Sequence, residues 1–190
     1  MRIFLDTEFM EDGETIIPLS IGLVRNDGVE YYAEFASIIQ ARPNDFVIEN
    51  VIPNLKTWQS YDSNPRVGIL SVSKGAKWKD EIKDELLEFC GNTPEFWGYY
   101  CTYDWVLICQ IFGNMTDLPA KPPYNWPMYC LDLKQEMYRT NWKKEQIELK
   151  YPQPTTHFSL HDARWVRNAL MYMEDLSHDS KAEISSQEIK

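Results

Sequence analysis

The sequence lacks long hydrophobic runs, and none approaches the roughly 20 apolar residues that cross a lipid bilayer. It also lacks the apolar core of a secretion signal, because Arg2, Asp6 and Glu8 interrupt the opening stretch. These absences predict a protein without a membrane partner. They also favour a cytoplasmic location over a secreted one.

Cysteine and histidine are scarce, with 4 Cys and 3 His among 190 residues. No two cysteines form a C-x-x-C pair, and no histidine lies at zinc-ligand spacing from any of them. The pattern therefore counts against a zinc site and against a disulfide framework. Reduced thiols in a cytoplasm are the simplest interpretation.

Positive charge is in deficit, because 19 Lys and Arg face 29 Asp and Glu, which gives a net charge of -10. Such an acidic surface repels polyphosphates at long range, which counts against a protein that coats nucleic acid. It does not exclude an enzyme whose metal ions neutralise a local group of carboxylates. With 44% hydrophobic residues, the chain is long enough for one globular domain with its own core.

Hydrophobic periodicity predicts a mixed α/β domain built around one sheet. The turn Asn26-Asp27-Gly28 predicts that the second and third strands form an antiparallel hairpin. Strands are expected over residues 1–8, 19–25, 29–35, 95–100 and 126–130. Helices are expected over residues 77–90, 103–112, 131–138 and 160–176.

Three stretches lack a clear period. Residues 40–76 contain scattered prolines and polar residues, so we expect short helices and loops there. Residues 150–156 predict a proline-containing loop. The end of the chain is polar, so we divide it into a domain over residues 1–176 and a frayed polar tail over residues 177–190.

The stretch FLDTEF places two carboxylates inside the first predicted strand. Side chains alternate across a strand, so Asp6 and Glu8 project from one face, about 7 Å apart. Paired carboxylates make a poor core and a good site for a hard cation. The alternative is an edge strand with one face in water, which leaves both residues simply solvated.

Two further acidic residues lie at the starts of predicted helices. Asp104 in TYDWVLICQIFG and Asp162 in THFSLHDARWVRNALMYM each have a structural interpretation, because a helix N-terminus favours Asp. Asp162 also follows His157 and adjoins His161, two of the few histidines in the chain. A histidine beside a metal carboxylate is a candidate proton carrier, whereas a lone histidine is usually structural or exposed.

Taken in order, FLDTEF, YYCTYDW and HFSLHDA resemble the DEDDh family of 3′→5′ exonucleases. That family combines D-x-E on its first strand, an Asp at the start of a later helix and an H-x4-D motif near the C-terminus. The opening RIFLDTEF and the stretch LSIGLV look most similar to its small mycobacterial-type exoribonucleases of bacteria and phages. The matching positions here are Asp6, Glu8, Asp104, His157 and Asp162.

The resemblance implies a ribonuclease-H-like fold, in which helices flank a five-stranded mixed sheet. It also implies two Mg²⁺ or Mn²⁺ ions per active site, with Asp6 bridging both. Glu8 and Asp162 would complete the ion that activates water, and Asp104 would hold the second ion through a water. His157 would act as the general base, with His161 as its rival.

The same resemblance implies hydrolysis of single-stranded RNA or 3′ overhangs to nucleoside 5′-monophosphates, and several relatives are homodimers. Thr7, Phe9 and Met10 are the expected contacts for the 3′-terminal nucleotide, although Phe9 and Met10 fit a core equally well. Two other functions stay open. One is a repair or proofreading exodeoxyribonuclease, which shares every catalytic residue, and the other is an inactive nuclease-fold module that binds nucleic acid.

Two features of the sequence stay open beside this resemblance. Many family members carry Asn where this chain has Tyr100, which alters the expected hydrogen bonds around Asp104 but not its carboxylate. Basic residues near the last predicted helix are either phosphate contacts or a solvated charged face. These basic residues are Lys143, Lys144, Lys150, Arg164 and Arg167.

Overall fold

A computed structural model describes residues 1–11, 13–36, 43–60, 70–72, 75–153 and 156–187. Its centre is a five-stranded sheet in the order β3-β2-β1-β6-β7. The first three strands pair antiparallel, whereas β6 runs parallel to β1 and β7 runs parallel to β6. The strands are β1 (Arg2–Glu11), β2 (Ile16–Arg25), β3 (Glu30–Glu34), β6 (Glu95–Gly98) and β7 (Leu131–Asp132).

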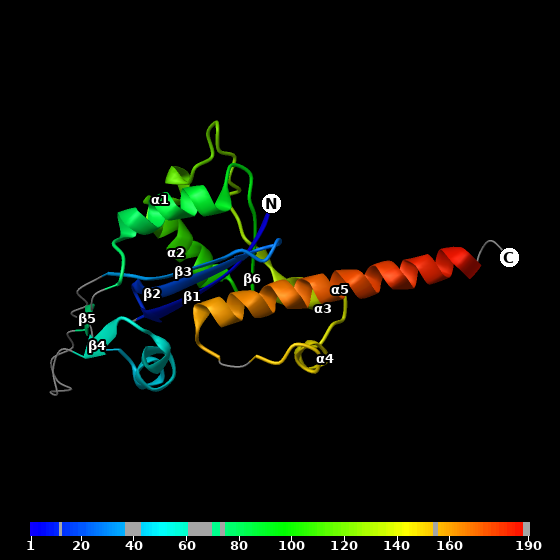
Figure 1. Ribbon diagram of the computed structural model, residues 1–190, viewed down its shortest axis with the longest axis horizontal. Coiled ribbons are helices and arrows are strands. Elements are labelled where there is room, and N and C mark those ends of the chain that lie inside the picture. The colour runs from blue at the N-terminus through cyan, green and yellow to red at the C-terminus, as the bar shows by residue number, and fades with distance from the viewer. Residues whose placement is uncertain (12, 37–42, 61–69, 73–74, 154–155, 188–190) are drawn as a thin grey trace.

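Helices cover both faces of this sheet (Figure 1), as in a ribonuclease-H-like domain, which confirms the predicted fold class. Along β1, Ile3 and Leu5 belong to the core beneath α1 and α2, whereas Phe4 belongs to the core beneath α3, α4 and α5. This alternation is the period of two that a doubly covered strand requires. The helices are α1 (Lys79–Cys90), α2 (Thr102–Phe112), α3 (Leu133–Arg139), α4 (Lys144–Glu148) and α5 (Ser159–Gln187).

The predicted hairpin between the second and third strands is confirmed. The Gly28 N–H donates to the Arg25 carbonyl at 2.9 Å, and Gly28 has a φ of 89° that only glycine adopts without strain.

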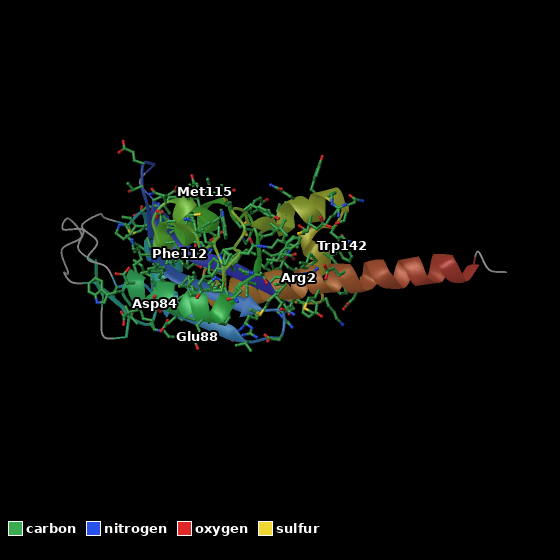
Figure 2. All side chains as sticks on the ribbon, turned by 90° about the horizontal axis from the view of Figure 1, so that it is seen from above. Arg2, Asp84, Glu88, Phe112, Met115 and Trp142 are labelled. Carbon is green, nitrogen blue, oxygen red and sulfur yellow. The ribbon has the colours of Figure 1, made fainter. Side chains whose placement is uncertain are left out.

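The helix predicted before Gly91 is also confirmed. Its buried side carries Ile82 and Leu86, whereas Asp84 and Glu88 are exposed on the side that faces the viewer in Figure 2. At the C-terminal end Gly91 has a φ of 66° and donates its N–H to Leu87, as a helix-ending glycine does.

A small lobe lies beside the C-terminal end of β1 (Figure 1). Its buried residues Val47 and Val51 pack with Met10 and Leu19 of the sheet. Short helices were expected in this region, but a strand hairpin was not, and residues 61–69 lie outside the described part of the chain. The lobe contains η1 (Val47–Val51), η2 (Ile52–Asn54), β4 (Trp58–Ser60) and β5 (Leu70–Val72), and a further turn, η3 (Met115–Asp117), follows α2.

The strand predicted over residues 126–130 is wrong. These residues are all described and form no strand, because Trp126 is buried with its indole N–H donating to the Gly91 carbonyl at 2.8 Å. Pro127, next in the chain, has no N–H to donate to a sheet ladder. The short strand β7 forms just after this segment, and the following helix starts at Leu133.

The predicted end of the last helix at residue 176 is also wrong, because α5 continues to Gln187. Both views show this part of α5 extending beyond the sheet (Figures 1 and 2). Nearer the sheet, Arg2 pairs with Glu174 of α5 at 2.6 Å. The division into a domain and a tail stays a prediction. Within the described residues, no helix combines the length and apolar character needed to cross a membrane.

Candidate active site

The middle of β1 carries the first two predicted site residues on the face covered by α5. Asp6 lies opposite Gly22 of β2, and Glu8 lies opposite Ser20. The pairing is interrupted by a bulge between Glu8 and Phe9, and bulges commonly re-aim side chains beside active sites.

Gly22 lets the start of α5 approach β2 closely. A Cβ on Gly22 would lie 2.4 Å from the backbone nitrogen of Leu160, so no larger residue fits without moving the helix. The hydroxyls of Ser20 and Ser159 meet at 2.9 Å and fix the same approach. The first turn of α5 is thereby held against β2, next to the strand that carries Asp6.

Three predicted carboxylates converge as a result. Asp6, Glu8 and Asp162 each offer an oxygen, and these atoms lie within 4.8 Å of one another. Burial first, then the charges of Asp104, Asp162 and Glu8, raise the pKa of Asp6 well above its usual value. Burial and the charges of Asp162 and Asp104 raise the pKa of Glu8 to about 8. Such a cluster is stable only with bound protons or cations.

Asp162 is oriented by neutral donors on both oxygens. The Phe158 N–H donates to Oδ2 at 3.1 Å, and the Gln153 side chain donates to Oδ1 at 2.7 Å. The first bond lies at the start of α5, but its donor is Phe158 and not Ser159, the partner that a capping box with Asp162 would use. Asp162 therefore contacts the helix start as well as the carboxylate cluster. Gln153 was not predicted, because a single polar residue in a proline-containing loop gives no signal of its partner.

Asp104 approaches from the opposite side of the strand. β1 pairs with β6 only as far as Phe4, so the N–H of Thr7 is free of the ladder on that side. Asp104 Oδ1 accepts hydrogen bonds from the Thr7 N–H at 2.9 Å and from its hydroxyl at 2.5 Å. Burial raises the pKa of Asp104 to about 6, although the bonds from Thr7 oppose that rise. Asp104 thus lies beside the other three carboxylates but outside their 4.8 Å group.

The two histidines occupy different environments. His157 lines the cleft in a left-handed conformation with φ of 61°, its ring 4.9 Å from that of Phe46, and Asn54 donates to its carbonyl at 3.1 Å. His161 does not line the cleft, and its ring packs 4.7 Å from that of Phe158. Burial and then the charge of Arg164 lower the pKa of His161.

The carboxylates open into a cleft of about 430 Å³ between β1, the small lobe and α5. Thr7 and Phe9 line it, and the ring of Phe9 packs edge-on against Tyr103 at 5.6 Å. Met10 does not line the cleft, because it is 4% exposed and packs beneath the small lobe. The structure therefore separates Met10 from the other two predicted substrate contacts.

The basic residues near α5 are also separated by the structure. Arg164 forms two hydrogen bonds with Glu30 of β3, and Arg167 donates to the Asn26 carbonyl, so both contact the β2–β3 hairpin. Lys144 lines the cleft.

Tyr100, the departure from the family pattern, has a φ of 56°. Asn is one of the residues that tolerates this left-handed conformation, so the backbone here would also accept the Asn that the resemblance implies. The ring of Tyr100 is exposed and lies beneath the ammonium of Lys134 at 5.9 Å. Asp104 takes its hydrogen bonds from Thr7 in this chain.

The sheet order, the helices on both faces and the acidic cleft define a nuclease-type α/β domain of ribonuclease-H-like fold. The chain belongs to the family described as the 3′-5′ exoribonuclease Rv2179c-like domain, whose model matches residues 1–173. It is 32% identical over 174 residues to the 3′-5′ exoribonuclease Rv2179c of Mycobacterium tuberculosis strain H37Rv, covering 86% of this chain and 88% of the relative. The 3′-5′ exoribonuclease MT2234.1 of strain CDC 1551 has the same identity and coverage.

Proposed function

We propose that this protein is a metal-dependent 3′→5′ exoribonuclease of the DEDDh type that acts on single-stranded RNA or 3′ overhangs. The observation that carries the proposal is the meeting of Asp6, Glu8 and Asp162 within 4.8 Å in an open cleft. Family membership over residues 1–173 supports the direction and the RNA substrate. The products would be nucleoside 5′-monophosphates.

The donor set suits a hard divalent cation. All three clustered groups are carboxylates, and oxygen ligands favour Mg²⁺ or Mn²⁺ over zinc. Burial first, and then repulsion from neighbouring carboxylates, raises the pKa values of Asp6 and Glu8, and cations would relieve that repulsion. Asp6, Glu8 and Asp162 would hold the ions directly, and Asp104 would hold the second of two ions through a water.

When bound, two such ions would supply an activated water and stabilise the departing 3′ oxygen. The chain's own residues would supply position and proton transfer. Thr7 fixes one oxygen of Asp104, and Phe158 and Gln153 fix the two oxygens of Asp162, so neither carboxylate is free to turn.

His157 would accept the proton of the attacking water. It lines the same cleft as Asp6, Glu8 and Asp162, whereas His161 does not. A neutral imidazole can accept a proton through a ring nitrogen, which suits a general base. The packing of Phe46 against its ring and the bond from Asn54 to its carbonyl hold His157 at the cleft.

The terminal nucleotide would meet Phe9. This ring lines the cleft beside the carboxylates and is supported by Tyr103, which gives a terminal base an aromatic surface. Stacking of this kind contributes about 1–3 kcal/mol per base and tolerates any base. Met10 would support the wall from beneath rather than touch the base.

A set of end-labelled oligomers tests the proposal. Matched single-stranded RNA, single-stranded DNA and overhung duplexes are incubated with Mg²⁺, with Mn²⁺ or with a chelator. We expect stepwise release of nucleoside 5′-monophosphates from RNA 3′ ends, abolished by the chelator. Faster degradation of DNA would instead indicate the exodeoxyribonuclease, and binding without release from any 3′ end would indicate an inactive module.

A further inference from the structure

Lys144 occupies a distinct wall of the cleft. Its ammonium lies 5.4 Å from the ring centre of Trp165 and 5.8 Å from that of Tyr99. It also pairs with Glu148, one helical turn further along α4, at 3.2 Å. The side chain still keeps 35% of its surface exposed, so the charge is held in place while remaining open to a ligand.

The charge of Lys144 is unusual for its surroundings. Among the described residues that line the cleft, it alone carries a permanent positive charge, whereas Asp6, Glu8, Glu11 and Asp162 are acidic. A polyanionic substrate entering this cleft therefore meets one side-chain cation that does not depend on bound metal.

Internal contacts do not fully account for this arrangement. A cation over an aromatic ring at an exposed site stabilises a protein by about 0.5–1 kcal/mol. An exposed ion pair stabilises it by about 0–1 kcal/mol. An ammonium has three N–H donors, of which Glu148 takes one.

Lys144 lies near the carboxylate cluster: its charge acts on Asp162, where it opposes the rise in pKa that burial causes. Its ammonium is fixed over the ring of Trp165. Trp165 lies three residues after Asp162, nearly one turn of about 5.4 Å along the same side of α5. A strand whose reacting phosphate lies at the carboxylate cluster would therefore bring its neighbouring phosphate toward Lys144.

We propose that Lys144 binds a backbone phosphate of the RNA strand other than the one being hydrolysed, with Tyr99 and Trp165 fixing its ammonium. This inference rests on the proposed exonuclease function and names a subsite within it. Such a subsite would strengthen binding of RNAs that have a second backbone phosphate. It would not strengthen binding of a dinucleotide, whose single phosphate is the one hydrolysed.

The test compares Lys144→Met and Lys144→Arg with the wild-type protein on two RNAs without a 5′ phosphate, a trinucleotide and a dinucleotide. Methionine keeps an apolar stem over both rings but removes the charge. For the trinucleotide, we expect Lys144→Met to raise KM about tenfold with little change in kcat, as expected for a lost charged hydrogen bond. For the dinucleotide both constants should stay within about twofold of wild type, and Lys144→Arg should retain most of the trinucleotide affinity.

Lys143→Met is the matched control, because Lys143 is the adjacent lysine, is exposed and does not line the cleft. It should leave both substrates unaffected. The slope of log affinity for the trinucleotide against log salt concentration should also become shallower in Lys144→Met, by the amount expected for about one lost phosphate contact. Lys143→Met should keep the wild-type slope.

An unchanged trinucleotide KM in Lys144→Met, or an equal loss on both RNAs, would overturn the inference. Isothermal titration of both RNAs in the presence of chelator separates this failure from failure of the proposed function. A wild-type protein that releases no nucleotide disproves the proposed function, while its affinity for the trinucleotide, compared with that of Lys144→Met, still decides the role of Lys144.

Discussion

At the scale of single residues, hydrogen bonds from neighbouring groups orient two of the four carboxylates. Thr7 holds Asp104 through two hydrogen bonds, and Gln153 and Phe158 hold Asp162. Glu8 is 6% exposed and faces other carboxylates, which makes its proton unusually hard to lose. The hydrogen bonds to Asp104 and Asp162 thus orient these two carboxylates through the protein's own groups.

Glu8→Gln should change the pH dependence of stability in the metal-free protein. The pKa of Glu8 rises from 4.5 to about 8 in the folded state, so folding becomes less favourable as pH rises through that window. The neutral variant escapes this loss and should exceed wild type in free energy of unfolding by more than ~1 kcal/mol at about pH 8.

Denaturant unfolding at several pH values measures this difference. The two proteins should converge near about pH 5, where Glu8 is protonated in the folded state. Saturating Mg²⁺ should reverse the order at high pH, because wild type gains more from the cation. A difference that grows toward low pH would contradict the raised pKa of Glu8.

His157→Ala should lower turnover about 10²–10⁴-fold while metal binding is retained, because the general base is lost but the carboxylates are not. His161→Ala is the matched control and should leave turnover nearly unchanged, since its ring packs on Phe158 outside the cleft. Single-turnover kinetics on a labelled RNA measure both variants. Severe damage in His161→Ala with a mild effect in His157→Ala would reverse the assignment.

At the scale of secondary-structure elements, the site depends on two close approaches. The start of α5 reaches β1 over Gly22, and the small lobe is tied to β3 through Glu34. Glu34 is buried and accepts hydrogen bonds from the N–H groups of Lys56 and Thr57, the Thr57 hydroxyl and the Tyr32 hydroxyl. The approach of α5 brings Asp162 to the site, and the attachment of the small lobe forms the cleft wall that carries Phe46.

Gly22→Ala should push the start of α5 away from β2. The added carbon would lie 2.4 Å from the Leu160 backbone, and overpacking of this kind costs about 1–3 kcal/mol. Activity should fall with stability, because Asp162 moves with the helix. Ser20→Ala is a control that removes the Ser20 hydroxyl, with its contacts to Ser159 and Tyr32, but adds no bulk against α5. It should cost about 1 kcal/mol while keeping activity. Wild-type stability and turnover in Gly22→Ala would contradict the role given to this approach.

Glu34→Gln should loosen the small lobe. A glutamine replaces one carboxylate oxygen by an NH₂ group, which then faces either the Lys56 N–H or the Thr57 N–H, and this mismatch costs about 1–3 kcal/mol. Limited proteolysis should therefore cut residues 43–60 faster, and KM should rise. Glu30→Gln, which breaks only the exposed pair with Arg164, should leave both unchanged. Equal protection in Glu34→Gln and wild type would show that the lobe is held by other contacts.

At the scale of the whole molecule, sequence motifs predicted the carboxylate convergence better than local patterns predicted the surrounding elements. The D-x-E and H-x4-D motifs of the family resemblance pointed to Asp6, Glu8 and Asp162, and these residues do meet. Gly22 and Gln153 gave no local signal, because each matters through a partner elsewhere in the chain. Gly22 faces the backbone of Leu160, and Gln153 donates a hydrogen bond to Asp162. Phe9 and Met10 could not be distinguished in advance, since the bulge after Glu8 sets where each side chain points.

The central claim is that Asp6, Glu8 and Asp162, with Asp104 beside them, form one site for divalent cations. Isothermal titration of Mn²⁺ into the metal-free protein tests it most directly, with Asp162→Asn as the comparison. We predict saturable binding of two ions per chain in wild type, with proton release near neutral pH, and a large loss of affinity in Asp162→Asn. The absence of saturable binding in wild type, or identical binding by Asp162→Asn, would contradict the account.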